Sequence, residues 1–522
     1  MLATIREWRN SLVPINRVPL DILSLIPTYL TFPHDGIFIS SVCRHWRRIF
    51  IQHTALWTCL CLTRPRTDLY MKTLLERSKG SALDIIVYQG PTSANPLRAE
   101  TLALLSPHAQ RIGSLSFIRN CWADIQKLSE VAAGPLPLLW TLKIRVVYGS
   151  SIFSPTVMTP PLLPPFADVV NLREFHLDSE GLPFLDHFIF PNLTTLELIA
   201  MPVEGFPGSQ LLNFLEASPT LQTVHITIKA DVLLGDVSPG RVVILPNVEM
   251  FNLLIGEGGP GCKVAAHISC PSAKLTSLRY EQYADNTISP EIFPTSVSWN
   301  AITRQCSASQ VDEIALWIMA TDDEPIIACF LAFLSPGPAV LSLGFEVTAR
   351  DDDDEVYVLG GWHAEIFSQA SKAIRTHPLL PNVKRLRIQD QYITIDSDRL
   401  TKIASEVGQL FKSMDPLDVL TLDIFDLRPY LAPFLDLPEF RDMDQPGGFP
   451  SIKELTIMQP SQAPAKQECM AAVVELAKSK HALGVPLERV TIHMRDHPPK
   501  MAEWLNPWVG VVDCHGEMGD DR

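Results

Sequence analysis

The sequence has little positive charge. Its 522 residues include 43 Lys and Arg against 58 Asp and Glu, which gives a formal net charge of −15. A protein that binds the phosphate backbone of nucleic acids usually carries clustered excess positive charge, and an anionic membrane surface attracts the same feature. We therefore expect neither nucleic acid nor a membrane among the partners. With 46% hydrophobic and 19% charged residues, the chain can still bury a large core.

Long apolar runs and cysteine pairs are also missing. The best candidate for a membrane-spanning helix, Ile326 to Leu334, ends after nine residues, whereas roughly 18 to 20 are needed. The N-terminal residues MLATIREWRN lack the uninterrupted apolar stretch of a secretory signal. The ten cysteines include no Cys-x-x-Cys pair, so neither a zinc site nor a disulfide framework is indicated. These features predict a soluble cytoplasmic or nuclear protein without metal or other cofactor.

Two motifs of enzymes are incomplete. Gly256 to Lys263 (GEGGPGCK) resembles a phosphate-binding loop, but Val264 stands where the hydroxyl residue that binds Mg²⁺ is required. His493 and His497 have the spacing of a zinc-protease helix, yet Met494 replaces the catalytic Glu. The sequence therefore predicts no catalytic site, and an uncharacterised enzyme is the less favoured interpretation.

A short pattern, apolar-x-x-apolar-x-apolar, recurs along the chain and is often preceded by Pro-Asn. The clearest copies begin at residues 193 (LTTLEL), 221 (LQTVHI), 248 (VEMFNL) and 275 (LTSLRY), at intervals of 28, 27 and 27 residues. Units of about 20 to 29 residues are typical of leucine-rich repeats. Further copies begin at Ile112, Leu139, Leu172, Val383, Leu417, Ile452 and Leu487.

Each copy predicts one short strand. Because successive side chains of a strand point to opposite faces, the fourth and sixth residues of the pattern point inward together. Amphipathic segments at 209–217 and 364–374 predict helices on the outer side of these strands. One strand-plus-helix unit cannot bury its apolar face alone, whereas a stack of units can. A string of ordinary βα units in an α/β domain is the alternative.

The predicted solenoid covers residues 81–495 and contains an irregular insertion around 285–380, where one weak copy begins at Val340. The acidic run Asp351 to Asp354 lacks the glycine of a calcium loop, so we interpret it as a solvated insertion. The proline-rich segment 151–166 is interpreted as a loop between repeats. Residues 61–80 are assigned to a connector, and residues 496–522 to a C-terminal tail or cap.

Residues 13–60 predict a small module of three helices. The first helix is predicted to begin at Pro19 and Asp21. Its apolar residues, three and four positions apart, are Ile22, Leu23, Ile26 and Leu30. The same spacing predicts a second helix with Phe38, Val42, Trp46, Ile49 and Phe50. Leu56 and Trp57 close the module, which at this size is only marginally stable alone.

Three blocks of this module resemble an F-box. They are Val18-Pro19-Leu20-Asp21-Ile22-Leu23, Val42-Cys43-Arg44-His45-Trp46-Arg47 and Leu56-Trp57. The family has Leu and Glu where this sequence has Val18 and Asp21. Pro27 also departs from the pattern, because a proline inside a helix costs about 3 kcal/mol or kinks it. The rest of the chain resembles the leucine-rich-repeat-like receptor region that follows the F-box in many large fungal families.

The resemblance implies a fold and a function. The fold would be α/β, with a small three-helix F-box module followed by an irregular leucine-rich-repeat-like solenoid of short strands and helices. The F-box would dock on the Skp adaptor, and through it on the cullin of a ubiquitin ligase, while the solenoid holds a protein substrate. The implied adaptor contacts are Pro19, Ile22, Leu23, Ile26, Val42 and Cys43, and burial inside the module is the alternative for each of them. The implied core residues are Leu30, Trp46, Leu56 and Trp57.

The outward side chains of the predicted strands would form the substrate face. Their charges balance, with six basic residues (Lys143, Arg145, Arg279, Arg385, Arg387 and Arg489) against six acidic ones (Glu174, Asp178, Glu197, Glu281, Asp423 and Glu454). Arg279, Arg385 and Arg387 are the candidate substrate contacts, and an ordinary solvated strand is the alternative. A repeat scaffold without a ligase role is the alternative function.

Overall fold

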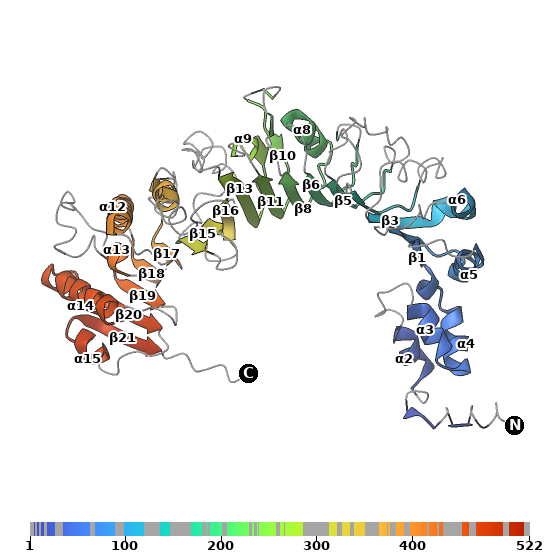
Figure 1. Ribbon diagram of the computed structural model, residues 1–522, viewed down its shortest axis with the longest axis horizontal. Helices are drawn as coiled ribbons and strands as arrows, with labels where there is room; N and C mark the ends of the chain where they lie inside the picture. Colours follow the sequence, from blue (N-terminus) through green and yellow to red (C-terminus); the bar gives the residue numbers. More distant parts are fainter. Residues whose placement is uncertain are drawn as a thin grey trace. The chain divides into compact units, whose positions relative to one another are not determined.

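The computed structural model describes two compact units, Met1–Val203 with Ser209–Ile226, and Glu204–Gly208 with Thr227–Arg522. Both units are α/β, with parallel strands and helices (Figure 1). The described residues are 5, 8–9, 12–14, 18–26, 35–62, 68–88, 99–118, 136–146, 169–179, 185, 188–200, 206–228, 232–233, 237–238, 240–256, 262–265, 267–284, 313–320, 326–334, 339–349, 365–372, 374–375, 383–390, 397–414, 417–424, 427–431, 452–458, 466–493 and 501–515. Within these ranges, no helix is both long and apolar enough to cross a membrane.

Three short helices near the N-terminus pack around one apolar core. They are α2 (Leu20–Leu25), α3 (Asp35–Ser41) and α4 (Arg44–Gln52). The core side chains are Leu23, Ile39, Trp46 and Phe50, and Val18, Ile26, Cys43, Ile49 and Leu56 pack against them. Helix α2 begins directly after Pro19, as the sequence predicts. It ends at Leu25, before Pro27, which like Leu30 lies outside the described residues.

The second predicted helix is broken into two, so its prediction as one continuous helix is wrong. Cys43 has an extended backbone (φ −157°, ψ 172°), and its Sγ accepts a hydrogen bond from the Trp46 N–H at 3.5 Å. Cys43 therefore satisfies one of the N–H groups that every helix leaves free at its first turn. The spacing of apolar residues is the same on both sides of this break, which is why the sequence pattern did not reveal it.

In the first unit the strands pair in sequence order, each parallel to the next. They are β1 (Cys59–Leu62), β2 (Leu83–Tyr88), β3 (Ile112–Ile118), β4 (Thr141–Val146), β5 (Glu174–Ser179) and β6 (Thr195–Ala200). Strand β8 (Thr223–Ile228) follows, and the Gln222 and Thr223 N–H groups donate to the Thr194 carbonyl. Helices α5 (Asp68–Ser78), α6 (Ala99–Leu105) and α8 (Gly208–Glu216) lie along one side of these strands (Figure 1).

The second unit continues with the same kind of strand. In order of pairing these are β11 (Met250–Gly256), β13 (Leu275–Ala284), β16 (Ala339–Ala349), β15 (Ile326–Leu334), β14 (Glu313–Ala320), β17 (Arg385–Asp390), β18 (Val419–Ile424), β19 (Glu454–Met458), β20 (Leu487–His493) and β21 (Val509–His515). All neighbours are parallel except β15, which is antiparallel to both β14 and β16. Helices α12 (Ser397–Ser413), α13 (Arg428–Leu431) and α14 (Lys466–Ala482) lie together on one side of β17–β20 (Figure 1).

The repeated pattern is confirmed as a series of strands. Each copy from Ile112 to Leu487 lies at a strand, and the weak copy at Val340 lies in β16. Where side chains are described, the first, fourth and sixth residues are buried, as for Leu193, Leu196 and Leu198. A backbone contact also joins neighbouring strands. The carbonyl of the residue before one strand accepts hydrogen bonds from two successive N–H groups at the start of the next strand. This contact occurs at Arg173, Lys384, Asp418 and Lys453.

The sheet extends beyond the predicted limits. The segment assigned to a connector, 61–80, contains the end of β1 and all of α5. The segment assigned to the tail or cap contains α15 (Met501–Leu505) and β21, which pairs in parallel with β20. The predicted irregular insertion around 285–380 contributes β14, β15 and β16 to the sheet. The acidic run 351–354, interpreted as solvated, lies outside the described residues.

The residues that precede the strands of the first unit form a second series of hydrogen bonds. Asn171 Nδ2 donates to the Pro137 carbonyl at 2.6 Å, and Asn192 Nδ2 donates to the Val170 carbonyl at 2.7 Å. Thr220 Oγ1 donates in the same way to the Pro191 carbonyl at 2.9 Å. In these three places, a polar side chain just before a strand therefore links its unit to the one before it, and Asn192 is the one that belongs to a Pro-Asn pair.

Replacing Asn192 with Ala should lower the free energy of unfolding by about 1 kcal/mol, the usual net contribution of one hydrogen bond. Gln222→Ala is the matched control, because Gln222 is an exposed amide just before another strand, and its side chain has no hydrogen bond to any residue that the structure describes. Its effect should stay within about 0.5 kcal/mol. Urea denaturation followed by circular dichroism measures both. Equal effects of the two substitutions would show that the Asn192 contact does not stabilise the sheet.

Candidate functional site

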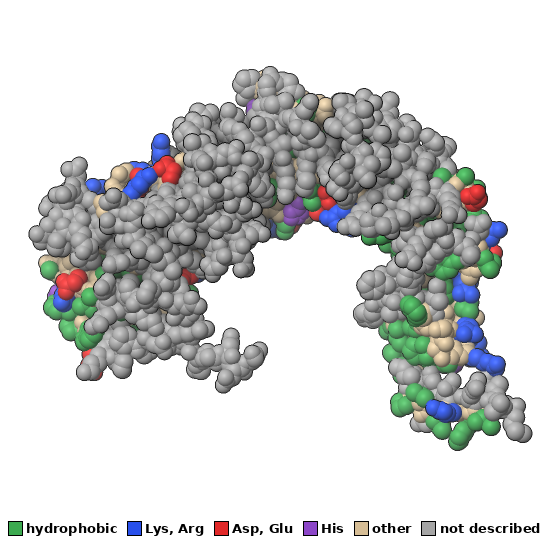
Figure 2. Space-filling view, in the orientation of Figure 1, with side chains coloured by type: hydrophobic (Ala, Val, Ile, Leu, Met, Phe, Trp, Pro, Cys, Tyr) green, Lys and Arg blue, Asp and Glu red, His purple; other side chains and the backbone are tan. Residues whose placement is uncertain are grey.

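The N-terminal helices carry an exposed apolar surface. Figure 2 shows hydrophobic side chains gathered over this part of the chain. Four of them are well exposed for their type, and we call them the helical apolar surface: Ile22 (49%), Leu25 (51%), Phe38 (68%) and Val42 (60%). Pro19 is exposed beside them in sequence. Monomeric proteins expose few contiguous apolar patches, so clustered large apolar side chains indicate an interaction site.

Local helix geometry explains which residues are exposed. Ile22 and Leu25 are three residues apart and share one side of α2, while Leu23 points to the core and is fully buried. Leu23 is therefore not an exposed contact, contrary to the role that the resemblance implied for it. Ile26 and Cys43 are half-buried against the core, so they offer only part of their surface.

Two of the predicted core residues, Trp46 and Trp57, are buried and Leu56 is partly buried, while Leu30 lies outside the described residues. Trp46 is buried and packs edge-on against Phe50, with ring centroids 5.4 Å apart, and Leu56 packs against the same core. Trp57 is buried too, and its Nε1 donates to the Phe50 carbonyl at 3.0 Å. The Arg77 guanidinium of α5 lies 4.5 Å from the centre of the Trp57 ring. Trp57 therefore joins the helical core to the first strand-and-helix unit.

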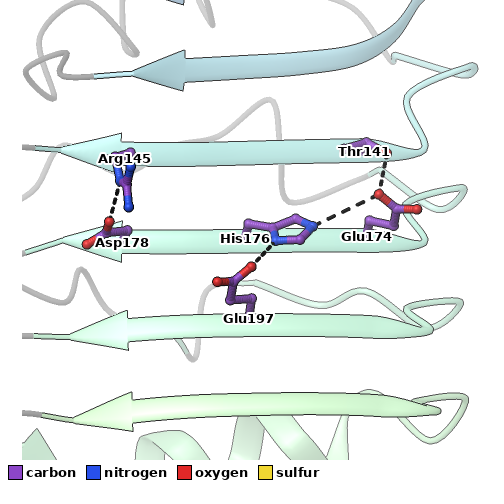
Figure 3. Close-up of polar contacts among 6 residues, drawn as sticks. All are labelled: Thr141, Arg145, Glu174, His176, Asp178 and Glu197. Atoms are coloured by element: carbon purple, nitrogen blue, oxygen red, sulfur yellow. Dashed lines mark hydrogen bonds and ion pairs between the residues drawn. The ribbon is translucent and has the colours of Figure 1, made fainter. Parts of the chain in front are cut away.

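The outward face of the first unit carries polar residues at alternate strand positions (Figure 3). The pairing of β4, β5 and β6 places these residues in rows across the strands. Arg145 lies opposite Asp178 in one row, and His176 lies opposite Glu197 in another. The first pair joins Arg145 Nε to Asp178 Oδ2 at 2.5 Å. In the second, His176 Nδ1 lies 2.5 Å from Glu197 Oε2.

Glu174 completes this arrangement. Its Oε2 accepts a hydrogen bond from Thr141 Oγ1 at 3.0 Å and lies 4.0 Å from His176 Nε2 (Figure 3). Charged groups on this face therefore have partners on neighbouring strands of the same sheet. An exposed pair of this kind contributes little stability, typically 0 to about 1 kcal/mol. The pairing does hold these side chains in place, so this face presents an ordered polar surface.

The outward face of the second unit also carries charged residues, among them Arg489, whose Nε lies 3.7 Å from Asp513 Oδ2 on the next strand. Arg385 and Arg387 lie on one strand, β17, and both point to this face, as the sequence predicts. Arg279 lies on β13, and three strands, β16, β15 and β14, separate it from β17. The structure does not describe the side chain of Arg279. The three arginines therefore do not belong to one local contact site.

The enzyme-like motifs form no recognisable centre in the described structure. His493 stacks on His515 of the next strand, with centroids 4.8 Å apart, while His497 lies outside the described residues. Residues 256–261 have G-x-G-x-x-G spacing as well, but α9 (Cys262–Ala265), which follows, has only four residues, unlike the long helix of a dinucleotide-binding unit. Among the residues described, no three His, Cys, Asp or Glu side chains are grouped to hold a metal.

Two of the described thiols, Cys59 and Cys270, are in environments that oppose ionisation and raise their pKa. Burial raises the pKa of Cys59 to about 12, and the carboxylate of Asp84 and the thiol of Cys61 add to the effect. Burial alone raises the pKa of Cys270 to about 12. Only the thiolate is a good nucleophile, so these cysteines are poor candidates for covalent catalysis.

Iodoacetamide at pH 8 should therefore label Cys59 and Cys270 at least ~100-fold more slowly in the folded chain than in urea, because the thiolate fraction falls tenfold per pKa unit. Mass spectrometry of the digested chain after timed labelling measures each rate. The urea-unfolded chain is the control for intrinsic reactivity. Rapid labelling of Cys59 in the folded state would contradict the burial described here.

Comparison with known proteins adds no family to this geometry: no protein-family model matches the chain, and neither does any curated protein.

Proposed function

We propose that the chain is a non-catalytic substrate receptor of a Skp–cullin–F-box type ubiquitin ligase. In this proposal α2, α3 and α4 form the F-box and dock on the Skp adaptor, and the strands and helices that follow form a leucine-rich-repeat-like solenoid that binds a protein substrate. The observation that carries the proposal is the helical apolar surface, which lies on the three helices that enclose the core of Leu23, Ile39, Trp46 and Phe50. The sequence blocks around Pro19, Val42 and Leu56 resemble the F-box at the same place.

The size of this surface supports a binding role. Complete burial of one large aliphatic or aromatic side chain is worth about 1.5 to 3 kcal/mol. Because Ile22, Leu25, Phe38 and Val42 are each about half to two-thirds exposed, covering them together would contribute on the order of 4 kcal/mol before entropic costs. Three short helices with one small core are only marginally stable, so a partner that covers this surface would also stabilise them.

The ladder of parallel strands supports the receptor role. Each strand presents alternate side chains outward, and the parallel register aligns them in rows that cross several strands. Such a surface is long and built from rigid elements, which suits recognition of an extended protein partner. A receptor of this kind needs no chemistry of its own. It raises the effective concentration of its substrate near the enzyme that is bound at the other end.

A repeat scaffold without a ligase role is the second candidate. The observation that favours it is that α2 has only six residues, which leaves a short helix to present Ile22 and Leu25. The two candidates differ in one measurable property, namely binding of the Skp adaptor. An enzyme would instead require a pocket with converging titratable groups.

The full-length chain should co-elute with the Skp adaptor after co-expression, and the double substitution Ile22→Asp with Val42→Asp should abolish this co-elution. Two buried carboxylates in the interface would each cost several kcal/mol, which exceeds the gain from apolar contact. Size-exclusion chromatography with mass analysis of the peak measures the complex.

Leu69→Asp is the matched control, because Leu69 is a large apolar residue of α5 that is 73% exposed and lies outside the helical apolar surface. It should leave the complex intact. All variants must keep the circular dichroism spectrum of the parent chain. A well-folded parent chain that does not co-elute with the adaptor would refute the ligase proposal and favour the scaffold.

A further inference from the structure

Two histidine side chains stack on the outward face of the second unit. His493 is the last residue of β20 and His515 is the last residue of β21, and the register of these parallel strands places the two residues directly opposite each other. The two strands lie side by side in Figure 1. The ring centroids are 4.8 Å apart, and the ring planes differ by 15°. The backbone pairing itself therefore brings the two imidazoles together.

The ring nitrogens of this pair have no protein partner in the part of the chain that the structure describes, since neither His493 nor His515 forms a hydrogen bond or an ion pair there. His267 is different, because its Nδ1 donates to the Arg241 carbonyl at 2.7 Å. The side chain of His493 is half-buried and that of His515 is exposed, so a small ligand can reach both.

A neutral imidazole has one nitrogen with a free lone pair, which makes histidine the commonest metal ligand in proteins. Imidazole nitrogens suit the late first-row transition metals, among them Zn²⁺, Ni²⁺ and Cu²⁺, whereas Mg²⁺ prefers oxygen ligands. Two adjacent imidazoles with unused nitrogens therefore have the chemistry of a transition-metal site.

The geometry fits such an ion after a small movement. Zinc binds imidazole nitrogen at about 2.0 to 2.1 Å, so two nitrogens of a tetrahedral site lie about 3.3 Å apart. The centroid separation of 4.8 Å is larger than this. Because His515 is exposed, its side chain has room to rotate toward His493 and close the difference. Water molecules would complete the coordination of the ion.

The charges next to His515 balance each other. Asp513 lies two residues before His515 and faces the same side of the sheet. Its carboxylate attracts a cation, while the Arg489 guanidinium, whose Nε lies 3.7 Å from Asp513 Oδ2, opposes that attraction. The binding energy of a metal ion would therefore come from the two imidazoles rather than from a surrounding negative field.

On the other side of the pair, Met458 of β19 lies directly opposite His493. Its Sδ is contacted by Arg387 Nη2 at 4.0 Å, so we do not assign the thioether as a ligand. Asp423 lies opposite Met458 on β18 and is close enough to Arg387 for the guanidinium to lower its pKa against the effect of burial. These two opposite charges lie beyond Met458, and the thioether provides a reporter next to the pair.

We propose that His493 and His515 together bind one late first-row transition-metal ion, of the class of Zn²⁺, Ni²⁺ and Cu²⁺. The ion would connect β21 to β20 through side chains in addition to the backbone pairing. This inference goes beyond the proposed receptor function and does not depend on it.

Zn²⁺ is the probe for the main experiment. The full chain, purified without a histidine tag, would be titrated with ZnCl₂ by calorimetry in a buffer that does not bind metals. We expect saturable binding that includes one site lost in the histidine variants. Labelling of the methionine methyl groups with ¹³C then locates this site. The Met458 signal, assigned by its loss in Met458→Leu, should shift as the site fills.

The variants test the ligands directly. Loss of an outer-shell partner already costs 10- to 100-fold in metal affinity, so His493→Gln and His515→Gln should each weaken this site at least about tenfold. His45→Gln is the matched control, because His45 is an exposed histidine of α4, and it should change nothing. His515→Cys, which restores a ligand that zinc accepts, should recover binding.

Two further measurements test the metal class and the link between the strands. Cu²⁺ should bind more tightly than Zn²⁺, as the general affinity order requires, and Mg²⁺ should not compete. Zinc should slow amide hydrogen exchange of β21 in the parent chain, because an ion that binds only the paired state stabilises it. The same ion should have no such effect in His515→Gln.

Zinc binding that is unchanged in both glutamine variants would overturn the proposal, even if thiols of the chain bind zinc elsewhere. Competition by Mg²⁺ would do so too, since it would assign the site to carboxylates. Circular dichroism must show that each variant keeps the fold of the parent chain. The result is separable from adaptor binding, because both glutamine variants should retain co-elution with the Skp adaptor.

Discussion

Parallel pairing of strands in one constant register is the constraint on which most of this structure depends. The carbonyls of Arg173, Lys384, Asp418 and Lys453 each accept from two successive N–H groups of the following unit, so neighbouring strands start at the same level. Once neighbouring strands start at the same level, the two-residue period of a strand determines which side chains point to each face of the sheet. Apolar side chains of every unit meet on the buried face, and polar side chains of every unit meet in rows on the other.

The sequence predicted the strands well where the inward residues are aliphatic. It missed β1 and β21 because Trp57 and Cys514 occupy places in the pattern that Leu or Ile usually fill. It also missed the antiparallel strand β15, whose nine consecutive apolar residues have no alternation to distinguish its two faces. The break between α3 and α4 was invisible for a different reason, since one cysteine side chain replaces a helical hydrogen bond without changing the apolar spacing.

The candidate surfaces were only partly predictable for the same physical reasons. Helical spacing identified Ile22 and Val42 but could not distinguish them from Leu23, because a six-residue helix has too few turns to define its buried side. The equal count of positive and negative charges was visible in the sequence. Which charges become partners depends on register, so the pair of Arg145 with Asp178 and the proximity of Arg387 to Asp423 emerge only when the strands are aligned. The structure does not describe Pro27, Leu30 or the side chain of Arg279. The kink expected at Pro27 and the roles predicted for Leu30 and Arg279 therefore remain predictions.

The position of β15 has a consequence for how the second unit folds. Most parallel pairs join residues about one repeat apart, for example Arg385 with Val419, so each closes a loop of similar length. Two pairs flanking the insertion join residues much farther apart. Thr276 pairs with Leu341, 65 positions later, and Glu313 pairs with Arg385, 72 positions later. Doubling a loop adds only about 0.6 kcal/mol of closure entropy, but non-local contacts slow folding more than they weaken it. The β14–β15–β16 meander can form from local contacts first. Because the pairs that join it to β13 and β17 are the distant ones, we expect them to form later than the meander itself.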